Sequence, residues 1–79
     1  MHIIYIIQSL KDLSYYTGRT TNLTKRIKDH NLGLSKYSST KKPFKLIWYC
    51  VFNDKKKAIK FEKYLKSGSG IVFRNKRLI

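Results

Sequence analysis

Acidic residues are scarce in this chain, which has four of them against eighteen lysines and arginines in 79 residues. The net charge of +14 makes the chain repel itself, so a polyanionic partner is expected to offset that repulsion. Nucleic acid is the first candidate, and an anionic membrane surface is the second. Among the four acidic residues, Glu62 is the single glutamate.

Cysteine and long apolar runs are also scarce. The one cysteine, Cys50, has no partner for an internal disulfide and lies in an apolar run, which predicts a small buried side chain. No Cys and His residues have the spacing of a zinc site. No apolar run reaches the ~18 residues that cross a bilayer, and the amino terminus lacks the pattern of a secretory signal. We therefore expect a cytoplasmic protein with no membrane segment, and its oligomeric state stays open.

The length and the 42% hydrophobic content predict one small globular domain over residues 1–79. A domain of this size buries only roughly 60–65% of its unfolded surface, so its core must be compact.

The first twenty residues predict a β-hairpin. Residues 2–7 and 15–20 are rich in β-branched and aromatic residues, and the segment between them is short and turn-like. Tyr5 and Tyr16 would then lie near each other on paired strands. Gly18 would either bend its strand or admit the close approach of another backbone or a ligand.

Two helices and a third strand are predicted downstream. Asn22, or Thr21 before it, suits the cap of a helix over about residues 22–31, and Gly33 suits its end. Residues 32–43 predict a basic loop, either phosphate-binding or simply solvated.

Residues 44–52 form the longest mainly apolar run and predict the central or most buried strand. A helix capped by Asn53 or Asp54 is expected to run to about Ser67 and to end at Gly68. Its core stripe consists of Ala58, Phe61 and Leu65. A short terminal segment follows.

Arg26 and His30 lie four residues apart, so they share one face of the first predicted helix. That face is either ordinary exposed surface or a catalytic one. In a catalytic role, Arg26 would bind phosphoryl oxygens and His30 would orient a nucleophile or exchange a proton.

Glu62 also has two interpretations. An ion pair with Lys66, four residues on, is usually worth less than ~0.5 kcal/mol. Alternatively, a lone carboxylate in a basic cleft suits Mg²⁺, which takes one or two carboxylates and completes its shell with water and substrate phosphate. With so few acidic residues, one metal ion is expected rather than two.

The tyrosines are candidates for chemistry as well. Tyr5 and Tyr16 could simply pack across the strands. As a base, a tyrosine with a reference pKa near 10 is phenolate in only about one molecule in a thousand at pH 7. Nearby cationic side chains, or a metal-bound water that passes its proton on, are expected to reduce that penalty. Tyrosines interleaved with basic residues could also stack on bases.

Taken in order, these motifs resemble the GIY-YIG nuclease superfamily, and in particular its small single-domain bacterial members. The matching segments are Ile3-Ile4-Tyr5, Tyr16-Thr17-Gly18, residues 22–30 and residues 61–70. The first motif lacks the initial glycine, and the second has threonine in place of isoleucine.

The resemblance implies an α+β fold with a three-stranded antiparallel sheet flanked by helices, in the order ββαβα plus a short C-terminal helix. The site would lie on one face of that sheet. The implied activity is that of a metal-dependent endonuclease on DNA, with one Mg²⁺ or Mn²⁺ ion and low sequence specificity or a structure preference. A non-catalytic nucleic-acid-binding module is the alternative.

The same resemblance distributes roles over seven residues. Tyr5 is the general base, Tyr16 assists it, Arg26 stabilises the phosphate, His30 supports the proton relay, Glu62 binds the metal, and Gly18 and Asn75 support the site. The sequence leaves the biological pathway open.

Overall fold

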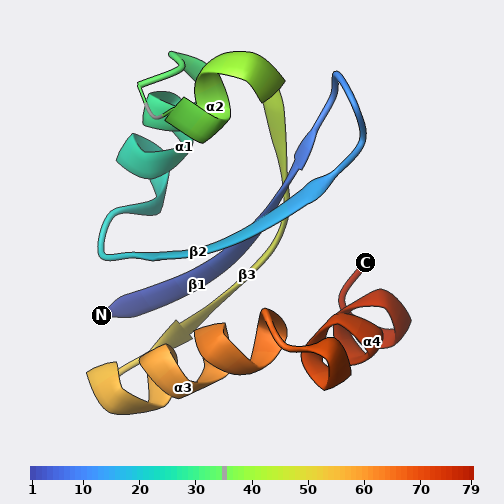
Figure 1. The fold of residues 1–79 in the computed structure, drawn as a ribbon. Coiled ribbons are helices and arrows are strands. Elements are labelled where there is room, and N and C mark those ends of the chain that lie inside the picture. Colours follow the sequence, from blue (N-terminus) through green and yellow to red (C-terminus); the bar gives the residue numbers. More distant parts are fainter. Residues whose placement is uncertain (35) are drawn as a thin grey trace.

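The computed structural model describes residues 1–34 and 36–79, which form a three-stranded antiparallel sheet and four helices (Figure 1). The strands are β1 (His2–Ser9), β2 (Tyr15–Thr20) and β3 (Phe44–Phe52), and the helices are α1 (Leu23–Asn31), α2 (Lys36–Lys41), α3 (Lys55–Leu65) and α4 (Gly68–Arg77). The predicted α+β class and the hairpin are confirmed. In the described residues, no helix has the length and apolar character needed to cross a membrane.

The sheet has the order β2-β1-β3, with β1 antiparallel to both neighbours. The prediction that residues 44–52 form the central strand is therefore wrong. Four consecutive residues of β1, from Ile4 to Ile7, are fully buried because both faces of the central strand are covered. At the β3 edge, by contrast, Tyr49 and Val51 are exposed.

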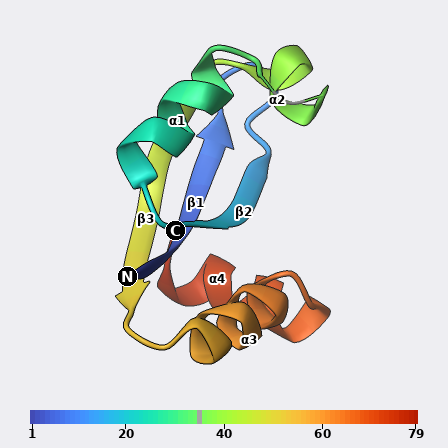
Figure 2. The same ribbon diagram turned by 90° about the vertical axis from the view of Figure 1, so that its left-hand side faces the viewer.

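Helices cover the sheet on both faces, with α1 and α2 on one side and α3 and α4 on the other (Figures 1 and 2). On the α1 face, Tyr5 and Ile7 pack with side chains that include Leu23 and Ile27 of α1. On the α3 face, Ile4 packs with Ala58 and Leu65, with Phe61 beside them, which confirms the predicted stripe of α3. Successive residues of β1 therefore serve opposite faces, as the geometry of a strand requires.

Asn22 is the cap of α1, because its side-chain Oδ1 accepts a hydrogen bond from the Lys25 N–H at 3.1 Å. The helix ends two residues before Gly33, whose φ of +71° lies in the left-handed region that favours glycine. Both helix signals of the sequence are confirmed.

The predicted loop over residues 32–43 contains a short helix, α2, so this prediction is wrong in part. Ser35 lies outside the described residues. The helix ends at Lys41, one residue before the cis peptide bond between Lys42 and Pro43, because the residue before a proline is disfavoured in helical geometry.

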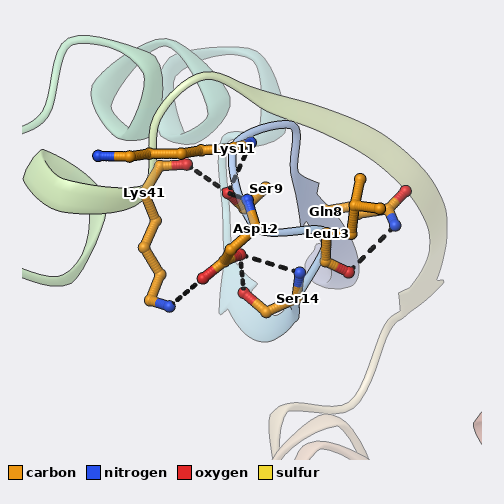
Figure 3. Close-up of polar contacts among 7 residues, drawn as sticks. All are labelled: Gln8, Ser9, Lys11, Asp12, Leu13, Ser14 and Lys41. Carbon is orange, nitrogen blue, oxygen red and sulfur yellow. Dashed lines mark hydrogen bonds and ion pairs between the residues drawn. The ribbon is translucent and has the colours of Figure 1, made fainter.

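A polar network ties α2 to the turn between β1 and β2 (Figure 3). The buried Ser9 hydroxyl donates to the Lys41 carbonyl at 2.6 Å and accepts from the backbone of Lys11 and Asp12. The Asp12 carboxylate accepts hydrogen bonds from Ser14 and forms an ion pair with the Lys41 ammonium. The Lys41 charge and the Ser14 donors hold the pKa of Asp12 well below its usual range.

The junction between α3 and α4 also differs from the prediction. Helix α3 ends at Leu65 rather than near Ser67, and Gly68 begins α4 instead of only ending α3. The Ser67 hydroxyl caps α4 by accepting from the Gly70 N–H at 3.2 Å. Gly70 is buried against the backbone of the last turn of α3, so the two helices approach closely at this junction.

We expect Gly70→Ala to destabilise the protein by about 1–3 kcal/mol, because its Cβ would overlap the Tyr64 carbonyl and lie 2.8 Å from the Leu65 Cα. Gly68→Ala is the matched control, since no atom lies within 4 Å of a Cβ at that position. Its stability should stay unchanged or rise by up to about 1 kcal/mol. Chemical denaturation of the two variants makes the comparison, and equal stabilities would contradict the proposed packing.

Candidate active site

The Tyr5 hydroxyl is the centre of a hydrogen-bonded cluster on the α1 face. The Nε–H of Arg26 donates to it at 3.3 Å, and His30 Nε2 lies 3.0 Å away. We infer that the phenol, whose oxygen accepts from Arg26, uses its own proton to donate to His30 Nε2. We infer that the imidazole carries its proton on Nδ1, and Nδ1 is buried without a hydrogen-bond partner in the described structure.

Gly18 makes room for this hydroxyl. It stands opposite Tyr5 in the register of β1 and β2, and a Cβ at Gly18 would lie 2.5 Å from the Cζ of Tyr5. Any larger residue would push the tyrosine ring away from Arg26 and His30. The close approach predicted for Gly18 is thus a contact with the neighbouring tyrosine, and its support of the site is steric.

Tyr16 and Phe44 complete the cluster around the imidazole. The ring of Tyr16 lies 5.2 Å from that of His30 and 6.4 Å from that of Tyr5, between centroids. The ring of Phe44, the first residue of β3, lies 5.5 Å from the ring of His30 between centroids. These contacts leave His30 only 4% exposed, so it is not part of an ordinary exposed helix face.

The pKa values of the cluster follow from its burial. Burial raises the pKa of Tyr5, and the hydrogen bond from Arg26 opposes that change without cancelling it. The cationic side chain of Arg26 lowers this pKa as expected, but burial outweighs its effect. Burial, helped by the Arg26 charge, lowers the pKa of His30, while Asp29 opposes this. At neutral pH the pair consists of a phenol and a neutral imidazole.

Glu62 comes from the opposite face of the sheet. Its carboxylate lies 3.4 Å from Arg19 Nε and 3.1 Å from Lys66 Nζ. Arg19 stands opposite Ile4 in the sheet register, and Ile4 packs under α3. Glu62 thus approaches the tyrosine cluster from the α3 side of β2, and the Nζ of its partner Lys66 lies 6.0 Å from the centroid of the Tyr16 ring. The carboxylate is still near enough for its charge to contribute to the raised pKa of Tyr5.

The structure confirms the ion pair between Glu62 and Lys66 that the sequence suggested, but Arg19 was missed. Alternation along β2 could have found it, because Tyr16 and Gly18 face α1, so that Arg19, the next residue, faces α3.

A metal ion at Glu62 fits the donor chemistry of this residue. Its carboxylate is a hard oxygen donor, and the side chain is 19% exposed. Among the described residues, no three His, Cys, Asp or Glu side chains gather as a ready-made metal site. Glu62 would thus supply one carboxylate, and an incoming ion would compete with Arg19 and Lys66 for its oxygens.

Asn75 stands apart from the cluster. Its exposed side-chain oxygen accepts two hydrogen bonds from Arg74, both at 3.1 Å. In the described part of the chain it has no contact with Tyr5, Arg26 or His30, so any support it gives the site passes through Arg74.

Comparisons with known proteins show the family of this chain. The family described as the GIY-YIG catalytic domain matches residues 1–74. The chain is 45% identical to a UPF0213 protein of Clostridium perfringens, over 84% of this chain and 71% of that protein. It is 41% identical to one from Staphylococcus haemolyticus, over 86% of this chain and 83% of that protein. The solution NMR structure of a UPF0213 protein from Bacillus halodurans is similar, with a TM-score of 0.52 and 39% identity, over 82% of this chain and 69% of that one.

The lowered pKa of His30 predicts a loss of stability in acid. Between the ordinary pKa near 6.5 and the lower value in the folded state, the unfolded chain binds a proton that the folded chain does not. The free energy of unfolding should therefore fall as the pH drops below about 6.5 and through this window. His30→Gln lacks this contribution. As the pH drops through this window, the free energy of unfolding should therefore fall more in wild type than in the variant.

Denaturation curves measured across this pH range test the effect, with His2→Gln as the control that retains His30. An unchanged pH dependence in His30→Gln would contradict the assignment.

Proposed function

We propose that this chain, which belongs to the GIY-YIG catalytic domain family, is a metal-dependent endonuclease that hydrolyses phosphodiester bonds in DNA. The hydrogen-bonded series Arg26–Tyr5–His30 carries the proposal, because it combines a phosphate-binding cation, a phenol and a neutral proton acceptor. The net charge of +14 supports a polyanionic substrate. We include a preference for DNA structure over sequence, since this cluster offers contacts to a phosphate and not to base edges.

His30 and Tyr5 act together in the proposed proton transfer. Tyr5 loses its proton to solvent by way of His30 Nε2 before the reaction. Its phenolate oxygen then accepts a proton from the attacking water as the water oxygen bonds to phosphorus. The bond from phosphorus to the leaving oxygen breaks, and that oxygen takes a proton from solvent. The raised pKa of Tyr5 makes the phenolate rare but strongly basic. The aromatic rings around His30 hold the imidazole in place for this transfer.

In this mechanism the Arg26 guanidinium moves from the Tyr5 hydroxyl to the phosphate of the substrate. In the present structure it covers the Tyr5 hydroxyl, which has no exposed surface. The rest of Arg26 is exposed, so its guanidinium can turn toward a phosphate and leave Tyr5 accessible to water. There it would stabilise the negative charge that develops on the phosphoryl oxygens.

Glu62 would hold one Mg²⁺ or Mn²⁺ ion, which stabilises charge on a phosphoryl oxygen when it is bound. Before binding, Arg19 and Lys66 neutralise the carboxylate. Once displaced from Glu62, these two cations are available to phosphate groups.

A non-catalytic nucleic-acid-binding module is the second candidate. Full burial of Tyr5 and the pairing of both Glu62 oxygens with cations favour it. Both candidates predict salt-sensitive binding, with a slope of roughly −0.9 per phosphate contact on duplex DNA. Cleavage, rather than binding, separates them.

Glu62→Gln should lower metal-dependent cleavage by roughly 100-fold or more, because the neutral amide is a poor metal ligand and the charge stabilisation is lost. Asp54→Asn is the matched control: it removes the same charge from the start of α3 and keeps a good helix cap. The substrates are labelled duplex, branched and single-stranded DNA, with RNA beside them, in Mg²⁺, Mn²⁺ or EDTA. A Glu62→Gln variant as fast as wild type would rule out the metal role, and tight binding without cleavage by either protein favours the binding module.

The cleavage rate should rise about tenfold per pH unit between about pH 7 and 9, as the phenolate fraction of Tyr5 increases. His30 is neutral throughout this range because its pKa is lowered, so its protonation does not limit the rate. Single-turnover measurements isolate the chemical step. A flat profile in such measurements would argue against Tyr5 as the base.

A further inference from the structure

A second site lies beside the tyrosine cluster, at the edge of the sheet. A cavity of about 270 Å³ is bounded by β2 and by the junction of α3 and α4. Tyr15 and Tyr16 line it from the strand, and Lys66 and Arg74 line it from the helices. Its volume is slightly below the ~300 Å³ at which pockets for drug-sized ligands begin, which suits one nucleotide-sized group.

The lining combines aromatic rings with cations. The Arg74 guanidinium carbon lies 5.0 Å from the centroid of the Tyr15 ring, and Lys66 Nζ lies 6.0 Å from that of Tyr16. Leu65 and Ile71 add apolar surface. A nucleobase stacks on such rings whatever its identity, while the cations meet its phosphate.

Arg74 is the cation most available for a phosphate. Its guanidinium donates to the neutral amide of Asn75, and no ion pair engages it in the described part of the chain. Asn75 therefore orients Arg74 without removing its charge. Lys66, in contrast, also pairs with Glu62.

Tyr16 connects this cavity to the candidate active site. It lines the cavity and also packs against Tyr5 and His30. Because β2 is an edge strand, a ligand can reach both its faces by passing around the edge. A nucleotide in the cavity would thus be a close neighbour of a phosphate held at Arg26.

We propose that this cavity binds one unstacked nucleotide next to the phosphate that is cleaved, with its base on Tyr15 and its phosphate at Arg74. A base inside a duplex would have to be unstacked and unpaired first, at a cost of a few kcal/mol, so the cavity favours a substrate that already has an unpaired nucleotide there. This inference deepens the proposed function and rests on it for the position of the cleaved phosphate.

Binding in EDTA tests the cavity without any cleavage. The probes are a duplex with a short single-stranded flap, the same duplex with an abasic flap, and a fully paired duplex. Wild type should bind the base-bearing flap about tenfold more tightly than the abasic flap, because only the former has bases to stack. Tyr15→Leu should abolish this preference and leave duplex binding unchanged, whereas Tyr15→Phe should retain it.

Arg74→Gln should weaken binding of both flaps more than binding of the duplex. Lys60→Ala, which removes an exposed charge from α3, is the control and should weaken all three complexes alike. Equal affinity of wild type for the two flaps would overturn the proposal. An equal loss on both flaps in Tyr15→Leu would do the same, and thermal unfolding verifies that each variant folds.

The two proposals fail separately. A flap preference without cleavage in Mg²⁺ would leave the nucleotide site in place and remove the nuclease. Cleavage that depends on Glu62, without a flap preference, would do the reverse.

Discussion

The hydrogen bond between the Tyr5 hydroxyl and His30 Nε2 joins the centre of the sheet to α1, across 25 residues of sequence. Much of the surrounding structure is arranged to permit it. Gly18 leaves the space that the phenol occupies, and the Asn22 cap starts α1 so that His30 falls two turns later, over the strand. A neutral imidazole and a protonated phenol follow from the burial of this pair.

The few acidic residues each have a specific structural partner. Asp12 pairs with Lys41 at the hairpin, Asp29 pairs with Lys25 on α1, and Asp54 caps α3. Glu62 faces two cations, Arg19 and Lys66. Most of the positive charge is therefore left without acidic partners, as expected of a surface that meets a polyanion. Glu62 is the place where metal and phosphate would compete with the protein's own charges.

Local signals in the sequence predicted much of the fold. The hairpin, the capped helix α1 and the stripe of α3 follow from alternation, capping chemistry and helical spacing, and all three are confirmed. The central position of β1 could not be read from hydrophobicity, because both β1 and β3 are apolar and tertiary packing decides which is covered twice. The junction at Ser67 and Gly70 depends on a backbone contact between helices, which has no sequence pattern of its own.

In the candidate site, too, local sequence patterns predicted some features, while tertiary packing decided the others. Helical spacing placed Arg26 with His30, and strand pairing placed Tyr5 with Tyr16. The raised pKa of Tyr5 was not predicted, because composition shows the nearby charges but not the degree of burial. Nor was the ion pair of Glu62 with Arg19 predicted, since the face on which α3 packs is a property of the whole chain.

The central claim is that the Tyr5 hydroxyl donates its proton to His30 Nε2 in a hydrogen bond. Nitrogen NMR of the His30 imidazole at neutral pH tests this most directly. The account predicts a neutral ring with its proton on Nδ1, and an Nε2 signal that changes when Tyr5 is replaced by phenylalanine. A ring protonated on Nε2, or one charged at pH 7, would contradict the proposed relay.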